Sequence, residues 1–331
     1  MQAKKFGILG NAAKPGAKEA VNELLKLLHA RGANECTVSS ELADIITGST
    51  KYHSSASPLE IAKSSDIIFS LGGDGTLLTA ARSIIRANPS VELIGVNLGK
   101  LGFIAENSPD VMPEIIDELW ADKLIREERL LIGAKITSES DDKTGVEIRR
   151  DDLDPSREGE RGDKAHLVAL NEIAIDNYGS TRMLTFEIIV QGSLLGTIRA
   201  DGLIIASPTG STGYAASAGG PIVEPTSPVI IITPIAAHTL TVRPVIVPEW
   251  YEIDLRITCE AATPALIVAD GQEEVVAVTP ALVRLSGHPD KLKLLRRSTH
   301  TYFDLLRTKL LWSADARQLV ETRYIASLHT K

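Results

Sequence analysis

Two glycine-rich turns constrain the fold of this chain more than any other feature of its sequence. The first, GGDGT at 72–76, follows an apolar run at 66–71 and precedes a run with helical spacing at 77–85. The second, SPTGST at 207–212, follows the apolar run 203–206 and precedes a short helix-compatible stretch. Glycine lets backbone approach a ligand closely, and a helix N-terminus offers unpaired N–H groups to an anion. Two such turns predict a phosphate-rich ligand held between two parts of the protein.

The hydrophobic pattern divides the chain near residue 130. Before it, strand-like runs such as 6–9 and 92–97 alternate with helical runs. This alternation predicts an α/β domain with a mostly parallel sheet, which binds ligands beyond the carboxyl ends of its strands. After residue 130, apolar runs separated by Gly, Pro and Asp predict a mainly β domain. Its expected strands are 167–175, 184–190, 203–206, 229–232, 251–257, 266–269 and 281–285.

Three segments before residue 130 carry sequence signals for helices. Apolar residues recur at helical spacing over 21–28. A capping box with proline at the first helical position stands at 57–60. Ser108-Pro109 opens a further helix whose inner face would be formed by Met112, Ile115, Ile116, Leu119 and Trp120.

Length and composition complete the expected organisation. A chain of 331 residues is long for one core. We therefore expect an α/β domain at 1–130, a mainly β substrate-binding domain at 131–290, and a C-terminal helical tail at 291–331 that is rich in Leu and basic residues. Segment 138–164 is crowded with charged residues and Gly and has few apolar ones, which predicts a flexible insertion between strands.

The net charge and the cysteine content limit the expected binding partners and cellular location of the protein. The formal net charge of −8 argues against a nucleic-acid or anionic-membrane partner. No apolar run approaches the roughly 20 residues that span a bilayer, and no signal peptide is visible. Cys36 and Cys259 lie far apart, so a disulfide framework is not expected. These features predict a cytoplasmic protein.

The carboxylate at Asp74 points to chemistry. In a loop that only cradles phosphate, this charge would repel the ligand. It suggests a metal ion between the two, or a proton to be removed, as in phosphoryl transfer. The alternative is a turn aspartate that bonds its own backbone.

These motifs, in this order, resemble the NAD kinase family. The resemblance runs from about residue 67 to about 310. GGDGT alone also fits lipid kinases and phosphofructokinases, but the ordered set is specific. The family usually has alanine where this chain has Gly213. The matching motifs are GGDGT at 72–76, NLGKLGF at 97–103, Asn171-Glu172, Asp201-Gly202, PTGST at 208–212, SAGGP at 217–221 and DGQ at 270–272.

The resemblance implies a reaction. ATP would phosphorylate the adenosine ribose 2′-hydroxyl of NAD, giving NADP and ADP. Asp74 matches the family's catalytic residue, and a carboxylate there can accept the proton or hold the hydroxyl in line. Gly72, Gly73, Gly75 and Thr76 match the phosphate loop.

The resemblance also implies the contacts with NAD. Asn171 and Glu172 would contact the adenine and ribose side, and Asp201 would face the cationic nicotinamide. Arg199 precedes Asp201 by two positions, on the same face if the strand continues. Tyr214 would stack on a base or, alternatively, fill a core. The residues expected to contact NAD are Asp74, Gly75, Asn171, Glu172, Arg182, Arg199, Asp201, Thr212, Gly213, Tyr214, Ala215, Ala216, Ser217 and Gln272.

The sequence and the resemblance together also suggest the metal ion, the oligomeric state and the alternative functions. The seven histidines show no metal-ligand spacing, so Mg²⁺ is expected to arrive with ATP and not in a protein metal site. In the family, the tail packs back on the first domain and chains form dimers or tetramers; we expect a homodimer or homotetramer. Inorganic polyphosphate stays open as an alternative donor. The alternative functions are a lipid or sugar kinase and a non-catalytic NAD-binding sensor.

Overall fold

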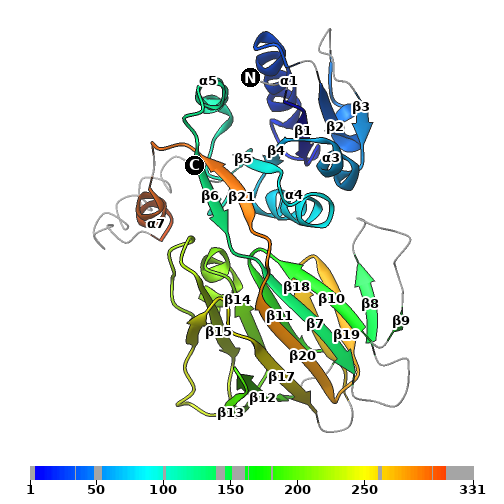
Figure 1. The fold of residues 1–331 in the computed structure, drawn as a ribbon, viewed down its shortest axis with the longest axis vertical. Coiled ribbons are helices and arrows are strands. Elements are labelled where there is room, and N and C mark those ends of the chain that lie inside the picture. Colours follow the sequence, from blue (N-terminus) through cyan, green and yellow to red (C-terminus); the bar gives the residue numbers. More distant parts are fainter. Residues whose placement is uncertain are drawn as a thin grey trace, which may run out of the picture.

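The computed structural model describes residues 4–33, 35–47, 54–99, 102–138, 146–150, 161–162, 164–179, 182–259, 263–299 and 301–310. Within them the chain forms an α/β part on one seven-stranded sheet and a β part made of two antiparallel sheets (Figure 1). A short helix, α7 (Tyr302–Leu310), follows the last strand. This architecture confirms the fold class predicted from the sequence.

The seven-stranded sheet has the order β3-β2-β1-β4-β5-β21-β6. Pairing is parallel from β3 through β21, and only β6 runs antiparallel to its neighbour. The carboxyl ends of the parallel strands therefore meet at one edge. The strands are β1 (Phe6–Gly10), β2 (Cys36–Ser39), β3 (Ser54–Ala56), β4 (Ile67–Gly72), β5 (Glu92–Asn97), β6 (Ile125–Arg129) and β21 (Leu292–Arg296).

Helices cover both faces of this sheet. They are α1 (Ala17–Ala30), α2 (Ser40–Ala43), α3 (Pro58–Ser64), α4 (Asp74–Ala87), the 3-10 turn η1 (Pro109–Val111) and α5 (Met112–Trp120). α1 and α5 share one core with the strands, and α3 and α4 share another. The predicted capping box is present, because Ser57 accepts the N–H of Glu60 and Glu60 accepts the N–H of Ser57. Trp120, placed on the inner face of α5, stacks on Phe6 at 5.6 Å between ring centroids.

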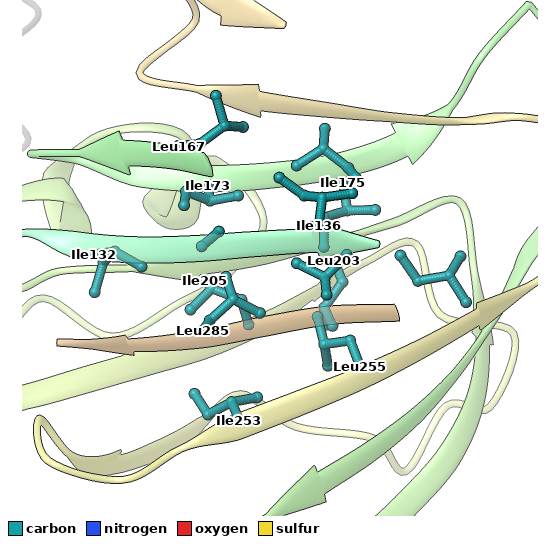
Figure 2. Close-up of a cluster of buried hydrophobic side chains, with 14 of the residues drawn as sticks. Ile132, Ile136, Leu167, Ile173, Ile175, Leu203, Ile205, Ile253, Leu255 and Leu285 are labelled. Carbon is teal, nitrogen blue, oxygen red and sulfur yellow. The ribbon is translucent and has the colours of Figure 1, made fainter. Parts of the chain in front are cut away.

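The β part packs two sheets face to face. One has the order β10-β7-β20-β17-β12-β13 and the other the order β16-β15-β14-β11-β18-β19-β8-β9. Alternate apolar side chains point between the sheets, as Figure 2 shows for Ile173 and Ile175 on one strand and Leu203 and Ile205 on the next. The strands are β7 (Ile132–Ser138), β8 (Val146–Arg150), β9 (Arg161–Gly162), β10 (Lys164–Ala169), β11 (Glu172–Asn177), β12 (Leu184–Val190), β13 (Ser193–Ala200), β14 (Gly202–Ala206), β15 (Val229–Ile235), β16 (Val245–Pro248), β17 (Ile253–Thr258), β18 (Ala265–Ala269), β19 (Glu273–Ala277) and β20 (Ala281–Gly287).

The prediction of one strand at 167–175 is wrong. The chain leaves β10 in one sheet at Ala169 and enters β11 in the other sheet at Glu172. The apolar run hides this change of sheet, because buried strands on both sides of the break are equally apolar. The break itself depends on contacts from distant residues, which are described with the site.

The predicted helical tail at 291–331 contains the short helix α7, but it begins with a strand that was not predicted. Leu292–Arg296 is the strand β21, which lies between β5 and β6 in the first sheet. Its Leu292, Leu294 and Leu295 are fully buried. This insertion between two existing strands stabilises an extended conformation that the composition alone does not reveal. Residues 311–331 of the predicted tail lie outside the described residues.

Segment 138–164, predicted as a flexible insertion, contains structure at its described positions. β8 pairs with β19 and extends the eight-stranded sheet, and β9 pairs with β8. β19 supplies the pairing edge for β8, and β8 supplies that for β9, and the charged composition did not predict either pairing. Residues 139–145, 151–160 and 163 lie outside the described residues. The strands β2, β3, β6, β13, β16 and β19 were also not predicted.

Candidate active site

The first glycine-rich turn joins β4 to α4. β4 is fully buried, and Gly73 is the N-cap of the 14-residue helix α4. Gly72 must be glycine, because a Cβ there would lie 2.2 Å from the hydroxyl oxygen of Thr76. The turn therefore brings the first residues of α4 to the carboxyl edge of the sheet, as predicted.

The carboxylate of Asp74 is enclosed by the backbone of the 102–105 loop. Its oxygens accept the N–H groups of Phe103, Ile104 and Ala105 at 2.8, 3.1 and 2.9 Å. Gly102 permits this approach, since a Cβ there would lie 2.0 Å from Asp74 Oδ1. These bonds fix the orientation of the carboxylate, and they explain the matching NLGKLGF motif, of which Lys100 and Leu101 lie outside the described residues.

A cavity of about 660 Å³ opens beside this turn. It lies at the carboxyl ends of β1, β2, β3 and β4, the position predicted for ligands in a parallel sheet. Asp74 faces it from one side, and Lys14 supplies a positive charge from the loop after β1. Other lining residues include Asn11, Ser39, Ser40, Glu41, Ser57, Gly73, Gly75, Thr76 and Thr79. The cavity therefore combines a helix N-terminus, hydroxyl groups and one lysine.

The pair Asn171-Glu172 sits where the chain changes sheets. Asn171 Oδ1 and Glu172 Oε2 are buried and have no hydrogen-bond partner among the residues that the structure describes. Glu172 is only 9% exposed. A buried polar atom without a partner costs about 1–3 kcal/mol, so these two atoms are suited to bind a ligand.

Burial also changes the titration of Glu172. Desolvation, reinforced by the charge of Asp270, raises the pKa of Glu172 to about 7, against an ordinary value of 4.5. The backbone N–H of Tyr214 opposes this shift. Glu172 therefore changes charge near neutral pH, and its ability to accept hydrogen bonds from a ligand changes with it.

The second glycine-rich turn packs directly on this pair. It runs from β14 through the 3-10 turn η3 (Thr209–Thr212) into the four-residue helix α6 (Tyr214–Ser217). Gly210 must be glycine, because a Cβ would lie 2.1 Å from the carbonyl oxygen of Asn171. A Cβ on Gly213 would lie 3.0 Å from Glu172 Oε2. The turn and the pair thus form one surface.

The residues of α6 differ in accessibility. Tyr214 is 42% exposed, which excludes the alternative that it fills a core. Ser217 is exposed, and Thr212, Gly213 and Ala216 are half-buried. Ala215 is fully buried and packs in a small core with Ala174, Ile204, Ala206 and Ile231, so its side chain supports α6 from below.

The structure does not place Arg199 and Asp201 on one continuous strand. β13 ends at Ala200 in one sheet, and β14 begins at Gly202 in the other. The premise for a shared face is therefore wrong. The pKa of Asp176 is raised, mainly because this carboxyl group is buried and secondly because the charge of Asp201 lies nearby. Arg199 and Arg182 are both exposed.

Gln272 connects the two halves of the site. Its Nε2 donates to the carbonyl oxygen of Gly75 at 3.0 Å, and its Oε1 accepts from Arg82 on α4. The expected contact residue of the β part is thus attached to the phosphate turn of the α/β part. Arg129 adds a second link, donating to the hydroxyl of Thr209 at 3.4 Å.

Some residues of the site were not predicted individually. Asp270 was noted only as part of the DGQ motif, yet its buried carboxylate accepts the N–H groups of Leu170, Asn171 and Glu172. Asn11 and Lys14 also escaped notice. Their signal was available, because they follow the buried strand β1, whose carboxyl end must face the same edge as β4.

Comparison with known proteins decides the family. The model of the ATP-NAD kinase N-terminal domain matches residues 6–124, and that of the ATP-NAD kinase C-terminal domain matches residues 170–297. An NAD kinase from Bacteroides fragilis is 36% identical over 320 residues, which cover 95% of this chain and 99% of that protein. This chain belongs to the NAD kinase family. An NAD kinase from Magnetococcus marinus is 34% identical over 309 residues, covering 93% of each chain.

Solved structures of this family share the fold. Yeast NADH kinase complexed with NADH has a TM-score of 0.80 at 20% identity and covers 94% of this chain and 89% of its own. An NAD kinase from Archaeoglobus fulgidus in complex with ATP has a TM-score of 0.64 at 24% identity, covering 92% of this chain and 98% of its own. Among the described residues, no helix has the length and apolar character required to span a membrane.

Proposed function

We propose that this chain phosphorylates the adenosine ribose 2′-hydroxyl of NAD with ATP, giving NADP and ADP. One observation carries the assignment of roles. The turn that carries the fixed carboxylate of Asp74 is attached, through the Gly75–Gln272 bond, to the half of the site where Asn171 Oδ1 and Glu172 Oε2 have no partner among the described residues. A group able to assist a hydroxyl thus lies in the same site as groups able to hold a nucleoside. Family membership agrees with this reaction.

Asp74 is the proposed catalytic residue. Its Oδ2 accepts one N–H, from Phe103, so it retains capacity to accept a hydrogen bond from the attacking hydroxyl. A carboxylate in this position can take the proton or hold the hydroxyl in line with the phosphate. The 102–105 loop would keep it oriented during the reaction.

Asn171 and Glu172 are proposed to bind the adenosine part of NAD. The free Oδ1 of Asn171 can accept from an exocyclic amine, and the free Oε2 of Glu172 can accept from ribose hydroxyls. Tyr214, exposed beside them, is placed to stack on the base. Asp201 is proposed to favour the cationic nicotinamide ring, together with the neighbouring charge of Asp176.

The 660 Å³ cavity is proposed to take the phosphates of ATP. The N-terminus of α4 and the ammonium group of Lys14 both favour anions there. Mg²⁺ is proposed to arrive with ATP and would neutralise charge that develops during phosphoryl transfer. The oxygens of Asp74 and Glu41 suit this ion. Among the described residues, no group of at least three His, Cys, Asp or Glu side chains could hold a metal ion.

A cytoplasmic location and a homodimer or homotetramer remain part of this proposal. The test of function is an assay of purified protein with NAD, ATP and Mg²⁺, in which NADP is read by a coupled dehydrogenase. NADP formation that requires NAD, ATP and protein is expected. Binding of NAD without turnover would instead support a sensor. Phosphorylation of diacylglycerol or fructose phosphate, with none of NAD, would support a lipid or sugar kinase.

A further inference from the structure

A three-residue turn between β18 and β19 touches both halves of the site. Asp270 and Gly271 have φ values of +52° and +65°, so two successive residues adopt the left-handed conformation. The N–H of Gln272 closes the turn on the carbonyl oxygen of Ala269 at 3.0 Å. This backbone directs the side chains of Asp270 and Gln272 to different partners.

Asp270 holds the break between β10 and β11. Its Oδ2 accepts the N–H of Leu170 at 2.8 Å, and its Oδ1 accepts those of Asn171 and Glu172 at 2.7 and 3.2 Å. Its own N–H donates to the carbonyl oxygen of Glu172 at 3.0 Å. Because the carboxylate binds three consecutive N–H groups, it fixes the backbone that carries the side chains of Asn171 and Glu172.

Gln272 holds the other half. Its amide donates to the carbonyl oxygen of Gly75 in the first turn of α4, and its amide oxygen accepts from Arg82 and, at 3.4 Å, from Thr79. The next residue, Glu273, pairs with Arg86, one helical turn further along α4. The helix that begins with Asp74 is thus attached to the same hairpin that fixes Asn171 and Glu172.

We propose that the 270–272 turn is a positioning element that sets the distance and orientation between the nucleoside-binding pair Asn171-Glu172 and the carboxylate of Asp74. This inference rests on the proposed function of those residues. Neither Asp270 nor Gln272 needs to touch the reacting atoms. Their effect arises because in-line attack depends steeply on geometry, and a misplacement of about 1 Å can reduce the rate by about 10²-fold.

The proposal makes Gln272 a determinant of rate and not of NAD affinity. In Gln272→Glu the acceptor for Arg82 is kept, but the donor to Gly75 is replaced by an oxygen that the carbonyl repels. We expect kcat to fall about tenfold, with the NAD dissociation constant within about twofold of wild type, because Asn171 and Glu172 stay fixed by Asp270.

The matched control is Gln191→Glu, which makes the same chemical change in another turn. This turn, like the 270–272 turn, contains a left-handed residue, since Gln191 itself has a φ of +51°. Its Nε2 donates to a carbonyl oxygen, as that of Gln272 does, namely that of Trp250 at 3.4 Å. We expect kcat of this variant to match wild type. Wild-type kcat in Gln272→Glu, or a loss of NAD affinity as large as the loss of kcat, would overturn the proposal.

Hydrogen exchange gives a readout that does not depend on catalysis. In Asp270→Asn the left-handed turn is tolerated, since asparagine adopts this conformation well, but one acceptor is replaced by a donor. We expect faster exchange of the amides of Leu170, Asn171 and Glu172 and a weaker affinity for NAD. Unchanged exchange there would overturn the role of Asp270.

The two failures are distinguishable. If wild-type protein forms no NADP, the proposed function fails whatever the variants do. If wild type is active and neither Gln272→Glu nor Asp270→Asn differs from it, only the positioning role fails. Should Gln272→Glu not fold, Gln272→Met replaces it as an unbranched side chain of similar length, with the same expected loss of kcat.

Discussion

The turn at 72–76 and the turn at 207–212 each follow a fully buried strand, yet they differ in what comes next. The first opens a helix of 14 residues and the second a helix of four. At the first turn, the carboxylate of Asp74 already accepts hydrogen bonds from three backbone N–H groups. Around the second, Asn171 Oδ1 and Glu172 Oε2 have no partner in the described chain.

This difference separates two tasks. A carboxylate with its bonds made keeps one orientation with or without substrate, which suits a group that must meet a reacting hydroxyl. Buried acceptors without partners destabilise the free protein by about 1–3 kcal/mol each, and a ligand that supplies donors recovers this energy as affinity. This difference supports the proposed division, in which the first turn serves the reaction and the second serves binding. The variants below test that division, from the largest expected effect to the smallest.

Asp74→Asn should show the largest effect. The change removes the proton acceptor and places an amide where three N–H donors converge. We expect turnover to fall by about 10²-fold or more, the scale of general-base loss, while NAD still binds. NADP formation and calorimetric NAD binding measure the two quantities. Asp66→Asn is the control, because Asp66 also accepts a backbone N–H, from Lys5 at 2.8 Å, at the opposite end of the same strand. Near-normal turnover in Asp74→Asn would remove this residue from the mechanism.

Gly102→Ala should cause part of the loss of turnover expected for Asp74→Asn, although the carboxylate of Asp74 itself is unchanged. The added Cβ would lie 2.0 Å from Asp74 Oδ1, so the carboxylate must move. We expect kcat to fall by between about tenfold and 10²-fold. Gly99→Ala in the same loop is the control, since its nearest neighbour would be 3.8 Å away. Equal kcat in the two variants would mean that the orientation of Asp74 is unimportant.

Glu172→Gln should affect binding more than rate. A hydrogen bond to a charged group contributes about 1.5–3 kcal/mol, so we expect the KM for NAD to rise about tenfold or more, with a smaller change in kcat. Wild-type affinity for NAD should itself increase as pH rises through about 7, where Glu172 ionises. Glu274→Gln is the control, because this exposed residue lies on β19 of the same sheet, two strands away from Glu172 on β11. A pH-independent affinity in wild type would contradict the role of the ionised carboxylate.

The same substitution should change stability in a defined direction. Since the pKa of Glu172 rises on folding from 4.5 to about 7, the folded state binds more protons in this range, and its stability falls as pH rises through it. Glu172→Gln removes this loss of stability at high pH, because glutamine does not ionise. Its Tm should exceed that of wild type at about pH 8, and the difference should shrink below about pH 5. Thermal unfolding at both pH values measures it, and a lower Tm for the variant at pH 8 would refute the sign.

Gly213→Ala should show the smallest effect. It introduces the residue that the family usually carries there. The Cβ would lie 3.0 Å from Glu172 Oε2, so the carboxylate must shift by a few tenths of an ångström. We expect NAD affinity to change less than about threefold. A change above tenfold would mean that Glu172 has no room to adjust.

The two turns were predictable because their strands, glycines and hydroxyls are local in sequence. The same holds for the parallel sheet and for the capping box at Ser57. What sequence reasoning missed depends on distant contacts. The break at Asn171 requires Asp270, about a hundred residues later, and β21 is a strand because β5 and β6 leave a place for it. Periodicity cannot report either.

Hydrogen exchange with and without NAD tests the division between the two turns most directly. If it is correct, the amides of Phe103, Ile104 and Ala105 exchange slowly in the free protein and change little when NAD binds, since Asp74 already holds them. Amides around Glu172 and in 212–217 should slow markedly on NAD addition. Fast exchange at 103–105 in the free protein, slowed only by NAD, would contradict the conclusion that the reactive half is formed before the substrate arrives.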